Sequence, residues 1–379
     1  MITGDSAIPR YHIQPYHMNG LNWRLVPDDP GRDNIVVVTG FMPSWWTYEY
    51  GITFGAEFHL DPEVHRATLA RMEAILRQRF GDLPNFFCGD DYANAFCMER
   101  RYGDALIPAL FGGAVSFEDA SGHPYAPSLR LSAAEAEALA VPDLANHPLT
   151  GSLLPQHDPA GWRIAGELGF EGVPKGLRIA GELGFEGVIN IAYKLRDYAL
   201  FTDMLDSPSR AHHIFEVTWQ TIDAFVHSVR DWQDPAGRRP RHFVNCNCLV
   251  NMISPRLYRQ QLLEFDQRFR RSFDVFGIHT CNWLVDPYLD ALAEIPGLAY
   301  LDMGEASDIE RVHHLFPELS PSVFVHPQRF VEMTEREIER HIDALGRRIG
   351  RGYILLSDLE AGTRDSQIRA AYEAAARLA

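Results

Sequence analysis

Two short motifs contain cysteine and histidine residues that could bind a metal ion. Cys246 and Cys248 stand in Asn-Cys-Asn-Cys, His279 and Cys281 stand in His-Thr-Cys, and each pair follows an apolar run that predicts a β-strand. Residues i and i+2 of a strand point to the same face, so each pair can direct both side chains at one ion. Thiolate and imidazole ligands select zinc over calcium or magnesium. The spacing differs from that of zinc fingers and favours a catalytic zinc site with an open coordination position; the alternative is a set of buried, unreactive cysteines.

The elements that must position these residues follow a regular alternation from residue 205 onward. The pattern predicts helices at about 208–232, 255–271, 286–294, 307–315, 334–349 and from 364, and strands at 241–245, 275–279, 298–303, 323–326 and 353–357. Polar residues recur at the strand ends, at 245–248, 279–281, 302–305, 326 and 357–358. This favours an α/β fold of the (β/α)8 TIM-type barrel class, with these residues facing one mouth.

The whole chain, residues 1–379, is predicted to form a single barrel domain, with residues 1–60 as an irregular N-terminal extension. A strand is expected at 34–39 and an amphipathic helix at about 62–80. The aromatic segment 41–51 admits two interpretations: a hydrophobic anchor for the extension, or one wall of a ligand pocket. In the second case the substrate-binding residues would be Trp45, Trp46, Tyr48 and Glu49, with Asn245 from the barrel mouth.

Further candidates are carboxylates beside predicted strands. Asp91 follows an apolar run, while Asp302, Asp358 and Glu360 lie at strand ends, where a barrel builds its active site. An exact repeat of 163–173 at 178–188 is interpreted as a tolerated surface insertion without a function, one copy being looped out.

Composition limits the classes of partner. The net charge of −16 argues against nucleic-acid binding, and no Lys/Arg run with interleaved aromatic residues is present. No apolar run approaches the roughly 18 residues that a bilayer crossing needs, and the N-terminal residues lack signal-peptide features, so no membrane association is expected. Five cysteines without the pattern of a disulfide framework agree with a cytoplasmic location.

Several segments together resemble the uroporphyrinogen decarboxylase superfamily. They are Asn251-Met-Ile-Ser-Pro-Arg-Leu-Tyr258, Phe276-Gly-Ile-His-Thr-Cys281, the segment 187–197, and the region from Asp91 to 112. The resemblance covers roughly residues 40–379 and implies a (β/α)8 barrel with its site at the carboxyl ends of the strands. It also implies a catalytic role for Tyr193, which lies in the segment 187–197.

Within that superfamily the chain resembles the zinc-dependent cobamide methyltransferases more than the true decarboxylases. The decarboxylases carry an arginine-rich N-terminal segment for their polycarboxylate substrate, whereas 42–49 here contains no arginine. In the methyltransferase branch His279 and Cys281 would be zinc ligands, and a corrinoid would carry the methyl group. The branch usually supplies a third cysteine near the last strand, where this chain has Ser357-Asp-Leu-Glu-Ala-Gly362. Either Asp358 or Glu360 replaces it, or Cys246 or Cys248 completes the site.

The resulting hypothesis is a zinc-dependent methyltransferase that moves a methyl group between a small substrate, such as a thiol or ether, and a corrinoid cofactor. Asp302 or Asp91 would serve as a proton donor or as a hydrogen-bond partner of His279. The sequence contains no cobalamin-binding motif of the D-x-H-x-x-G type, so the corrinoid is expected on a separate partner protein, and a homodimer is possible within the superfamily. Two alternatives stay open: a metal-independent decarboxylase or lyase with Asp91 as its polar anchor, and a non-catalytic zinc- or corrinoid-binding protein.

Overall fold

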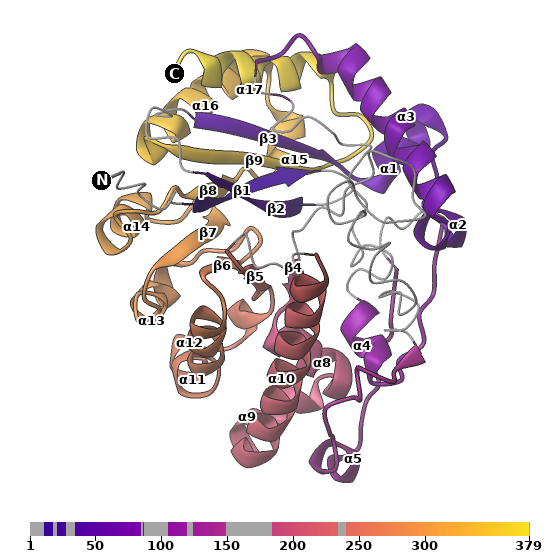
Figure 1. Cartoon of the computed structure of the whole chain (residues 1–379). Coiled ribbons are helices and arrows are strands. Elements are labelled where there is room, and N and C mark those ends of the chain that lie inside the picture. Colours follow the sequence, from indigo (N-terminus) through magenta and orange to yellow (C-terminus); the bar gives the residue numbers. More distant parts are fainter. Residues whose placement is uncertain are drawn as a thin grey trace, which may run out of the picture.

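The fold is built on a parallel β-sheet. The computed structural model describes residues 11–17, 21–27, 35–84, 86, 105–119, 124–148, 184–233 and 240–378. Within them, seven parallel strands lie in the order β3-β9-β8-β7-β6-β5-β4 and follow a curved path (Figure 1). Their bounds are β3 Ile35–Phe41, β4 Gly184–Glu186, β5 His242–Cys246, β6 Val275–His279, β7 Leu298–Gly304, β8 Ser322–Phe324 and β9 Gly352–Leu359.

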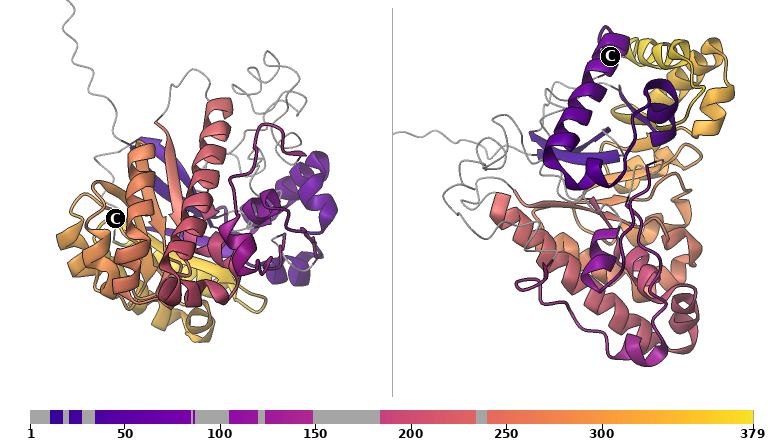
Figure 2. Two further views of the ribbon diagram at one scale, coloured as in Figure 1. Left: turned by 90° about the horizontal axis from the view of Figure 1, so that it is seen from below. Right: turned by 90° about the vertical axis from the view of Figure 1, so that its right-hand side faces the viewer.

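Helices follow the strands along the chain and pack around the outside of the sheet (Figures 1 and 2). They are α8 Val188–Arg196, α9 Ala199–Asp206, α10 Pro208–Gln233, α11 Pro255–Gln261, α12 Leu263–Ser272, α13 Leu289–Leu292, α14 Ile309–Leu315, α15 Pro327–Glu332, α16 Glu335–Ile349 and α17 Asp365–Ala376. This confirms the predicted mixed α/β class with a parallel sheet. Because parallel strands joined by helices are covered by them, all seven residues of β3 and all five of β5 are buried.

The helix boundaries follow local signals in the sequence. Ser254 caps α11 by accepting a hydrogen bond from the Leu257 N–H, and Pro255 occupies the first helical position. Thr334 and Glu337 form a capping box at the start of α16. The prediction of one helix at 255–271 was wrong in one respect: the helix is interrupted at Leu262 and continues as α12.

An antiparallel hairpin precedes the sheet and was not predicted. Its strands are β1 Tyr11–His17 and β2 Leu21–Pro27. The hairpin lies inside the curve of the sheet (Figure 1), where Ile13 and Trp23 pack in one apolar cluster with Val244, Cys246 and Tyr300. The Asn19-Gly20 dipeptide between the two runs is the sequence signal that could have identified it.

The aromatic segment after β3 forms the helix α1 Pro43–Tyr50. Trp45 and Trp46 are 0% and 1% exposed in the main hydrophobic core, and Trp45 stacks on Phe41 at a centroid distance of 4.1 Å. Tyr48 is 77% exposed, and Glu49 pairs with Arg79 at 3.3 Å. The two tryptophans therefore act as a hydrophobic anchor, whereas Tyr48 and Glu49 lie at the surface.

Two other N-terminal features bear on the sequence predictions. The predicted helix at about 62–80 is present as α3 Pro62–Phe80, preceded by the short helix α2 Ala56–Leu60. Strand β3 falls within residues 1–60, yet it pairs with β9 and belongs to the central sheet. The first copy of the repeat lies outside the described residues, but the end of the second copy supplies β4. The interpretation as a surface insertion was therefore wrong for this end of the repeat, which belongs to the central sheet.

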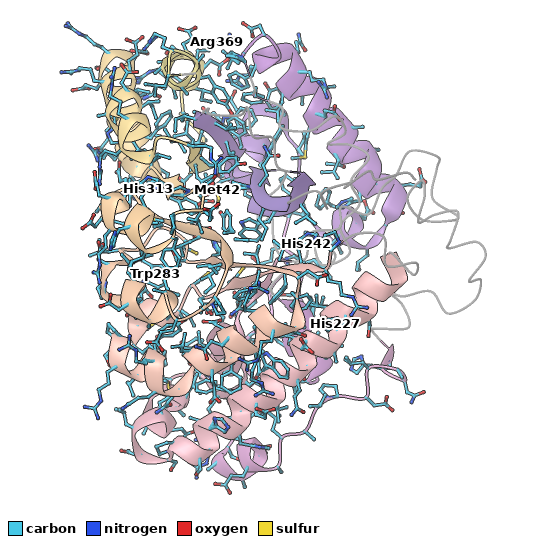
Figure 3. All side chains as sticks on the ribbon, turned by 60° about the vertical axis from the view of Figure 1, so that its left-hand side comes forward. Met42, His227, His242, Trp283, His313 and Arg369 are labelled. Carbon is cyan, nitrogen blue, oxygen red and sulfur yellow. The ribbon has the colours of Figure 1, made fainter. Side chains whose placement is uncertain are left out.

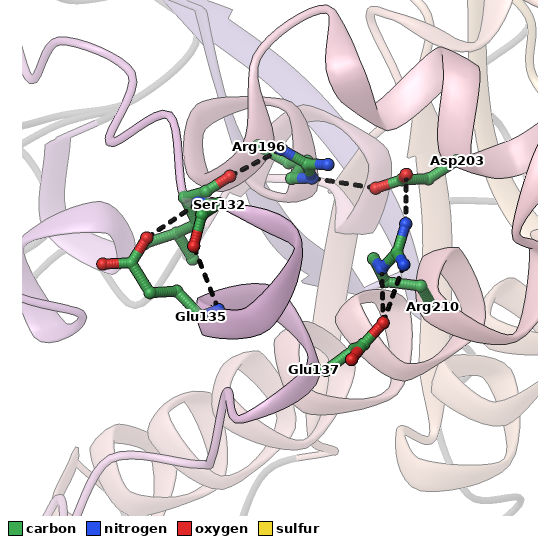
Figure 4. Close-up of polar contacts among 7 residues, drawn as sticks. Ser132, Glu135, Glu137, Arg196, Asp203 and Arg210 are labelled. Carbon is green, nitrogen blue, oxygen red and sulfur yellow. Dashed lines mark hydrogen bonds and ion pairs between the residues drawn. The ribbon is translucent and has the colours of Figure 1, made fainter.

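The segment 124–148 is fastened to the helices beside β4 by an ionic cluster (Figure 4). Arg196 of α8 donates to the Leu131 carbonyl oxygen and to Asp203 at 2.6 and 2.8 Å. Arg210 of α10 bridges Asp203 and Glu137, the last residue of the short helix α5 Ala133–Glu137. Asp203 is only 5% exposed, so its charge is compensated by two guanidinium groups rather than by water. A further short helix, α4 Leu106–Leu110, precedes this segment in the chain.

None of the helices in the described ranges has the length and apolar character of a membrane span.

A buried network of hydrogen bonds links the carboxyl end of β5 to α12. Asp266 accepts hydrogen bonds from the Asn245 and Asn247 amides at 2.7 and 2.9 Å and from the Tyr258 hydroxyl at 2.6 Å. Burial raises the pKa of Asp266 to about 6, although these three hydrogen bonds act in the opposite direction. The loop that follows Asn247 therefore leaves β5 from a fixed point.

The raised pKa of Asp266 predicts a specific pH dependence of stability. The folded state holds this proton more tightly than the unfolded chain, so the stability contributed by Asp266 is lost as the pH rises from about 4 through about 6. Between these values the free energy of unfolding of the wild type should fall relative to Asp266→Asn by up to about 3 kcal/mol. Urea unfolding at several pH values measures the difference. The control is Glu264→Gln on the same helix, whose carboxyl is 50% exposed; parallel profiles for wild type and Asp266→Asn would contradict the assignment.

Candidate metal centre

The register of two adjacent strands brings the cysteine and histidine motifs together. In the parallel ladder of β5 and β6, Cys246 lies opposite His279, an offset of 33 residues. The Asn247 N–H donates to the His279 carbonyl oxygen at 2.8 Å, so the same offset continues beyond the strand ends. Cys248 therefore lies opposite Cys281. In Figure 3, His242 at the start of β5 and Trp283 just after β6 lie toward opposite ends of the sheet, and the cluster belongs to the end marked by Trp283.

Three ligand atoms converge at this end. The Cys281 sulfur lies 3.0 Å from the Cys248 sulfur and 3.0 Å from Nε2 of His279, and all three atoms lie within 4.8 Å of one another. His279 is 8% exposed, and both cysteines are partly exposed. Both cysteines therefore lie nearer the surface than the imidazole does.

Asp302 of β7 fixes the orientation of the imidazole. Its carboxylate lies 2.6 Å from Nδ1 of His279 and also accepts hydrogen bonds from the Thr280 N–H and the Tyr300 hydroxyl at 2.6 and 2.8 Å. Asp302 is fully buried. Because Nδ1 faces the carboxylate, Nε2 is directed at the two sulfurs, as in the carboxylate–histidine pairs of metal sites.

The electrostatics of the cluster favour a cation. Burial alone lowers the pKa of His279, but the negative charge of Asp302 and its hydrogen bond to the imidazole outweigh burial and raise the pKa to about 10. The hydrogen bond with Cys281, together with burial, raises the pKa of the Cys248 thiol. Without an ion, His279 and Cys248 thus retain their protons, and a divalent cation would displace them, since metal ligands bind in their deprotonated forms.

Close backbone packing supports both ligand-bearing loops. A Cβ atom on Gly187 would lie 2.4 Å from the Cys246 carbonyl oxygen, and one on Gly304 would lie 2.6 Å from the Asn282 carbonyl oxygen. These glycines let neighbouring segments press against the loops on either side of the cluster. Cys281 itself adopts a φ of +59°, which is uncommon for a residue with a side chain. Such strain is typical of functional positions rather than of packing cysteines.

The hairpin supplies one side of the centre. The Trp23 ring lies 5.1 Å from the His279 ring and 6.0 Å from the Tyr300 ring, measured between centroids. Phe324 of β8 lies 6.0 Å from the His279 ring on the same basis. An apolar wall therefore surrounds the imidazole and its buried carboxylate partner, which strengthens their electrostatic interaction.

The donor set fits zinc better than a hard cation. Two sulfurs and one imidazole nitrogen are soft or borderline ligands, and three protein ligands leave an open position, as in catalytic zinc sites. Tetrahedral zinc with Zn–S bonds of about 2.3 Å would place two sulfurs about 3.8 Å apart. The Cys248 and Cys281 sulfurs would need to separate by under 1 Å, which side-chain rotation provides.

Of the alternatives for the third ligand, the structure brings Cys248 into the group. Cys246 lies at the end of β5 within the apolar cluster of Ile13, Trp23 and Tyr300 and is 8% exposed. Asp358 and Glu360, at the end of β9, are both exposed and lie outside the group of converging ligand atoms. The carboxylate alternative therefore finds no support in this arrangement.

The other predicted site residues lie elsewhere. The Asn245 side chain points to Asp266 of α12, on the helix side of β5. Tyr193 of α8 contacts the rings of Tyr198 and Phe201, and its hydrogen bond with Tyr198 raises its pKa to about 12. Trp45 and Trp46 belong to the core, as described above, and Asp91 lies outside the described residues. The structure thus unites His279, Cys281, Cys248 and Asp302.

Three supporting residues of the centre were not predicted from sequence patterns. Tyr300 and Thr280 hold the Asp302 carboxylate, and Trp23 flanks the imidazole. Tyr300 and Asp302 are separated by two positions on β7, so strand alternation places them on one face. That spacing could have suggested Tyr300, whereas the position of Trp23 depends on how the hairpin packs.

Comparison with known proteins agrees with the architecture. The fold is similar to that of a methyltransferase from Methanosarcina mazei, with a TM-score of 0.58 over 91% of this chain and 94% of that chain and with 15% sequence identity. At this identity the similarity shows the shared fold and no more. No protein-family model matches the sequence, and neither does any curated protein.

The cluster predicts which substitutions abolish metal binding. Chelator-washed wild type supplied with zinc should bind about one zinc per chain, and Cys248→Ser, His279→Ala and Cys281→Ser should lose it, because each removes one of three ligands. Cys246→Ser, the same substitution two residues earlier, should retain the metal. Elemental analysis after dialysis measures the content. Loss of zinc in Cys246→Ser with retention in Cys248→Ser would reverse the ligand assignment.

Asp302 should affect affinity rather than the number of sites. Asp302→Asn leaves all three ligands in place but weakens the orientation of His279, so zinc affinity should fall by about 10- to 100-fold. Competition with a chromogenic chelator gives the dissociation constant. Asp290→Asn is the matched control, because the Asp290 carboxylate is 69% exposed and pairs with Arg311. Equal affinity in wild type and Asp302→Asn would exclude an orienting role.

Proposed function

We propose that this protein is a zinc-dependent methyltransferase that moves a methyl group between a small substrate and a corrinoid. The observation that carries the proposal is the convergence of Cys248, His279 and Cys281 at the carboxyl end of a parallel sheet. In α/β folds of this kind, active sites form at that end. The fold similarity to a methyltransferase supports the same class of reaction.

The soft donor set favours a substrate with a sulfur atom. Zinc held by two thiolates and one imidazole would bind a thiol acceptor and keep it ionised at neutral pH, or act as a Lewis acid on an ether-like donor. We favour the thiol, because carboxylate ligands, which would suit an oxygen-bound substrate, lie outside the ligand group.

The protein's own residues have separable roles in this proposal. Cys248, His279 and Cys281 would hold the metal. Asp302 would orient His279 and balance its charge, since both carboxylate oxygens already accept hydrogen bonds and the group is fully buried. This favours an orienting role for Asp302 over that of a proton donor. Trp23 and Phe324 would exclude water from the inner side of the imidazole.

Three further features belong to the proposal. We infer that the curved sheet closes into a (β/α)8 barrel, with β3 and β4 as the described strands at its two ends. In this proposal a separate protein docked over the mouth presents the corrinoid. A homodimer is compatible with this arrangement.

Methyl transfer with free methylcobalamin tests the function. Zinc-loaded wild type mixed with methylcobalamin and a panel of small thiols should consume the methylated cofactor, followed by its absorbance. Cys281→Ser should be slower by about 100-fold or more, since removing Lewis-acid activation costs several kcal/mol. The reverse reaction, from methyl thioethers or ethers to reduced cobalamin, establishes the direction. Cys246→Ser serves as the control.

Each negative result points to one alternative. Zinc binding without methyl transfer in either direction would indicate a zinc- or corrinoid-binding protein that lacks turnover. Activity that survives complete removal of zinc would reject the metal mechanism. A protein that binds no metal when freshly prepared would restore the decarboxylase or lyase interpretation to first place.

A further inference from the structure

The two cysteines of the centre lie in direct contact with each other. Their sulfurs are 3.0 Å apart, whereas a disulfide has an S–S bond of about 2.0 Å. They stand opposite one another across adjacent strands, because the offset of 33 residues between β5 and β6 continues to Cys248 and Cys281. Backbones of neighbouring strands are about 4.8 Å apart, within the range that a disulfide spans. Joining the sulfurs therefore needs a shift of about 1 Å and no rearrangement of the sheet.

We propose that Cys248 and Cys281 form a reversible disulfide that competes with metal binding. Both residues are partly exposed, so an oxidant in solution can reach them, whereas Cys246 is buried in the cluster around Trp23. A disulfide would remove two of the three ligand atoms and leave His279 alone. The pair would thus switch the centre off under oxidising conditions. The competition with metal rests on the function proposed above, whereas the disulfide itself does not.

The chemistry balances with a hydroperoxide as the oxidant. One sulfur attacks a peroxide oxygen, the O–O bond breaks, and a sulfenic acid forms with release of one molecule of water when the oxidant is hydrogen peroxide. The second sulfur then attacks the sulfenic sulfur, the S–O bond breaks, and a second water leaves as the S–S bond forms. Two thiols lose two electrons and two protons in total, and the peroxide gains them. A small dithiol reverses the step by thiol–disulfide exchange.

Two features of the site favour this outcome over irreversible oxidation. The second sulfur lies in contact with the first, so a sulfenic acid at either position meets its partner before a second molecule of peroxide. Cys281 has a φ of +59° and its sulfur already contacts that of Cys248, so this arrangement is present before oxidation.

Peptide mapping of the metal-free protein tests the disulfide independently of function. The reduced, chelator-treated full chain is exposed to one equivalent of hydrogen peroxide, remaining thiols are alkylated, and the digest is analysed without reduction. Trypsin cleaves after Arg256 and Arg271, so Cys248 and Cys281 fall on separate peptides. We expect one cross-linked pair in wild type and in Cys246→Ser, absent from Cys248→Ser and Cys281→Ser and reversed by dithiothreitol. Absence of the cross-link, or its persistence in Cys248→Ser, would overturn the proposal.

Zinc titration separates this inference from the proposed function. At free zinc ten times its dissociation constant, disulfide formation should slow by about tenfold, because about a tenth of the chains remain metal-free. Oxidation should release one zinc for each disulfide formed, measured with a chromogenic chelator. An unchanged rate with zinc bound would overturn the competition. A protein that forms the disulfide yet binds no zinc would refute the function and the competition while leaving the thiol pair established.

Discussion

The candidate centre depends on the register between β5 and β6. A slip of one residue would turn every side chain of one strand to the opposite face, and Cys248 would no longer meet Cys281. Buried packing on both faces holds the register: Val244 and Cys246 contact the hairpin, whereas Phe243 contacts Phe269 of α12. The position of three ligand atoms therefore follows from the hydrophobic core rather than from their own interactions.

The surroundings of the cluster divide into two layers of different chemistry. On the inner side, Trp23, Tyr300 and Phe324 form an aromatic wall around His279 and its partner Asp302. On the helix side, Asn245 and Asn247 fasten the loop after β5 to the buried Asp266. Both layers restrict motion of the ligands, and a preorganised ligand set binds its ion with a smaller entropic cost.

The same contact between Cys248 and Cys281 supports two kinds of chemistry. Thiolates that share an ion must separate slightly, whereas oxidised sulfurs must approach each other. The contact distance of 3.0 Å lies between the two requirements. A site of this form would carry out methyl transfer when reduced and metal-bound, and it would be protected from further oxidation when closed as a disulfide.

Much of this arrangement could be predicted from local patterns in the sequence. Alternating apolar runs and helical patterns located the strands from β5 to β9 and most of the helices between them, because these patterns reflect burial of one face. The spacing of His279 and Cys281 by two positions predicted that both would face one ion. The interruption between α11 and α12 could not be predicted in this way, because Leu262 carries no helix-breaking signal.

Tertiary structure decided which residues meet. Cys246 and Cys248 are equivalent by strand alternation, and only packing of the hairpin against Cys246 distinguishes the buried cysteine from the ligand. Asp358 and Asn245 also lie at strand ends, yet one is exposed and the other faces α12. A sequence pattern states the face on which a side chain lies relative to its own strand. What lies opposite that face depends on long-range contacts, which local periodicity does not encode.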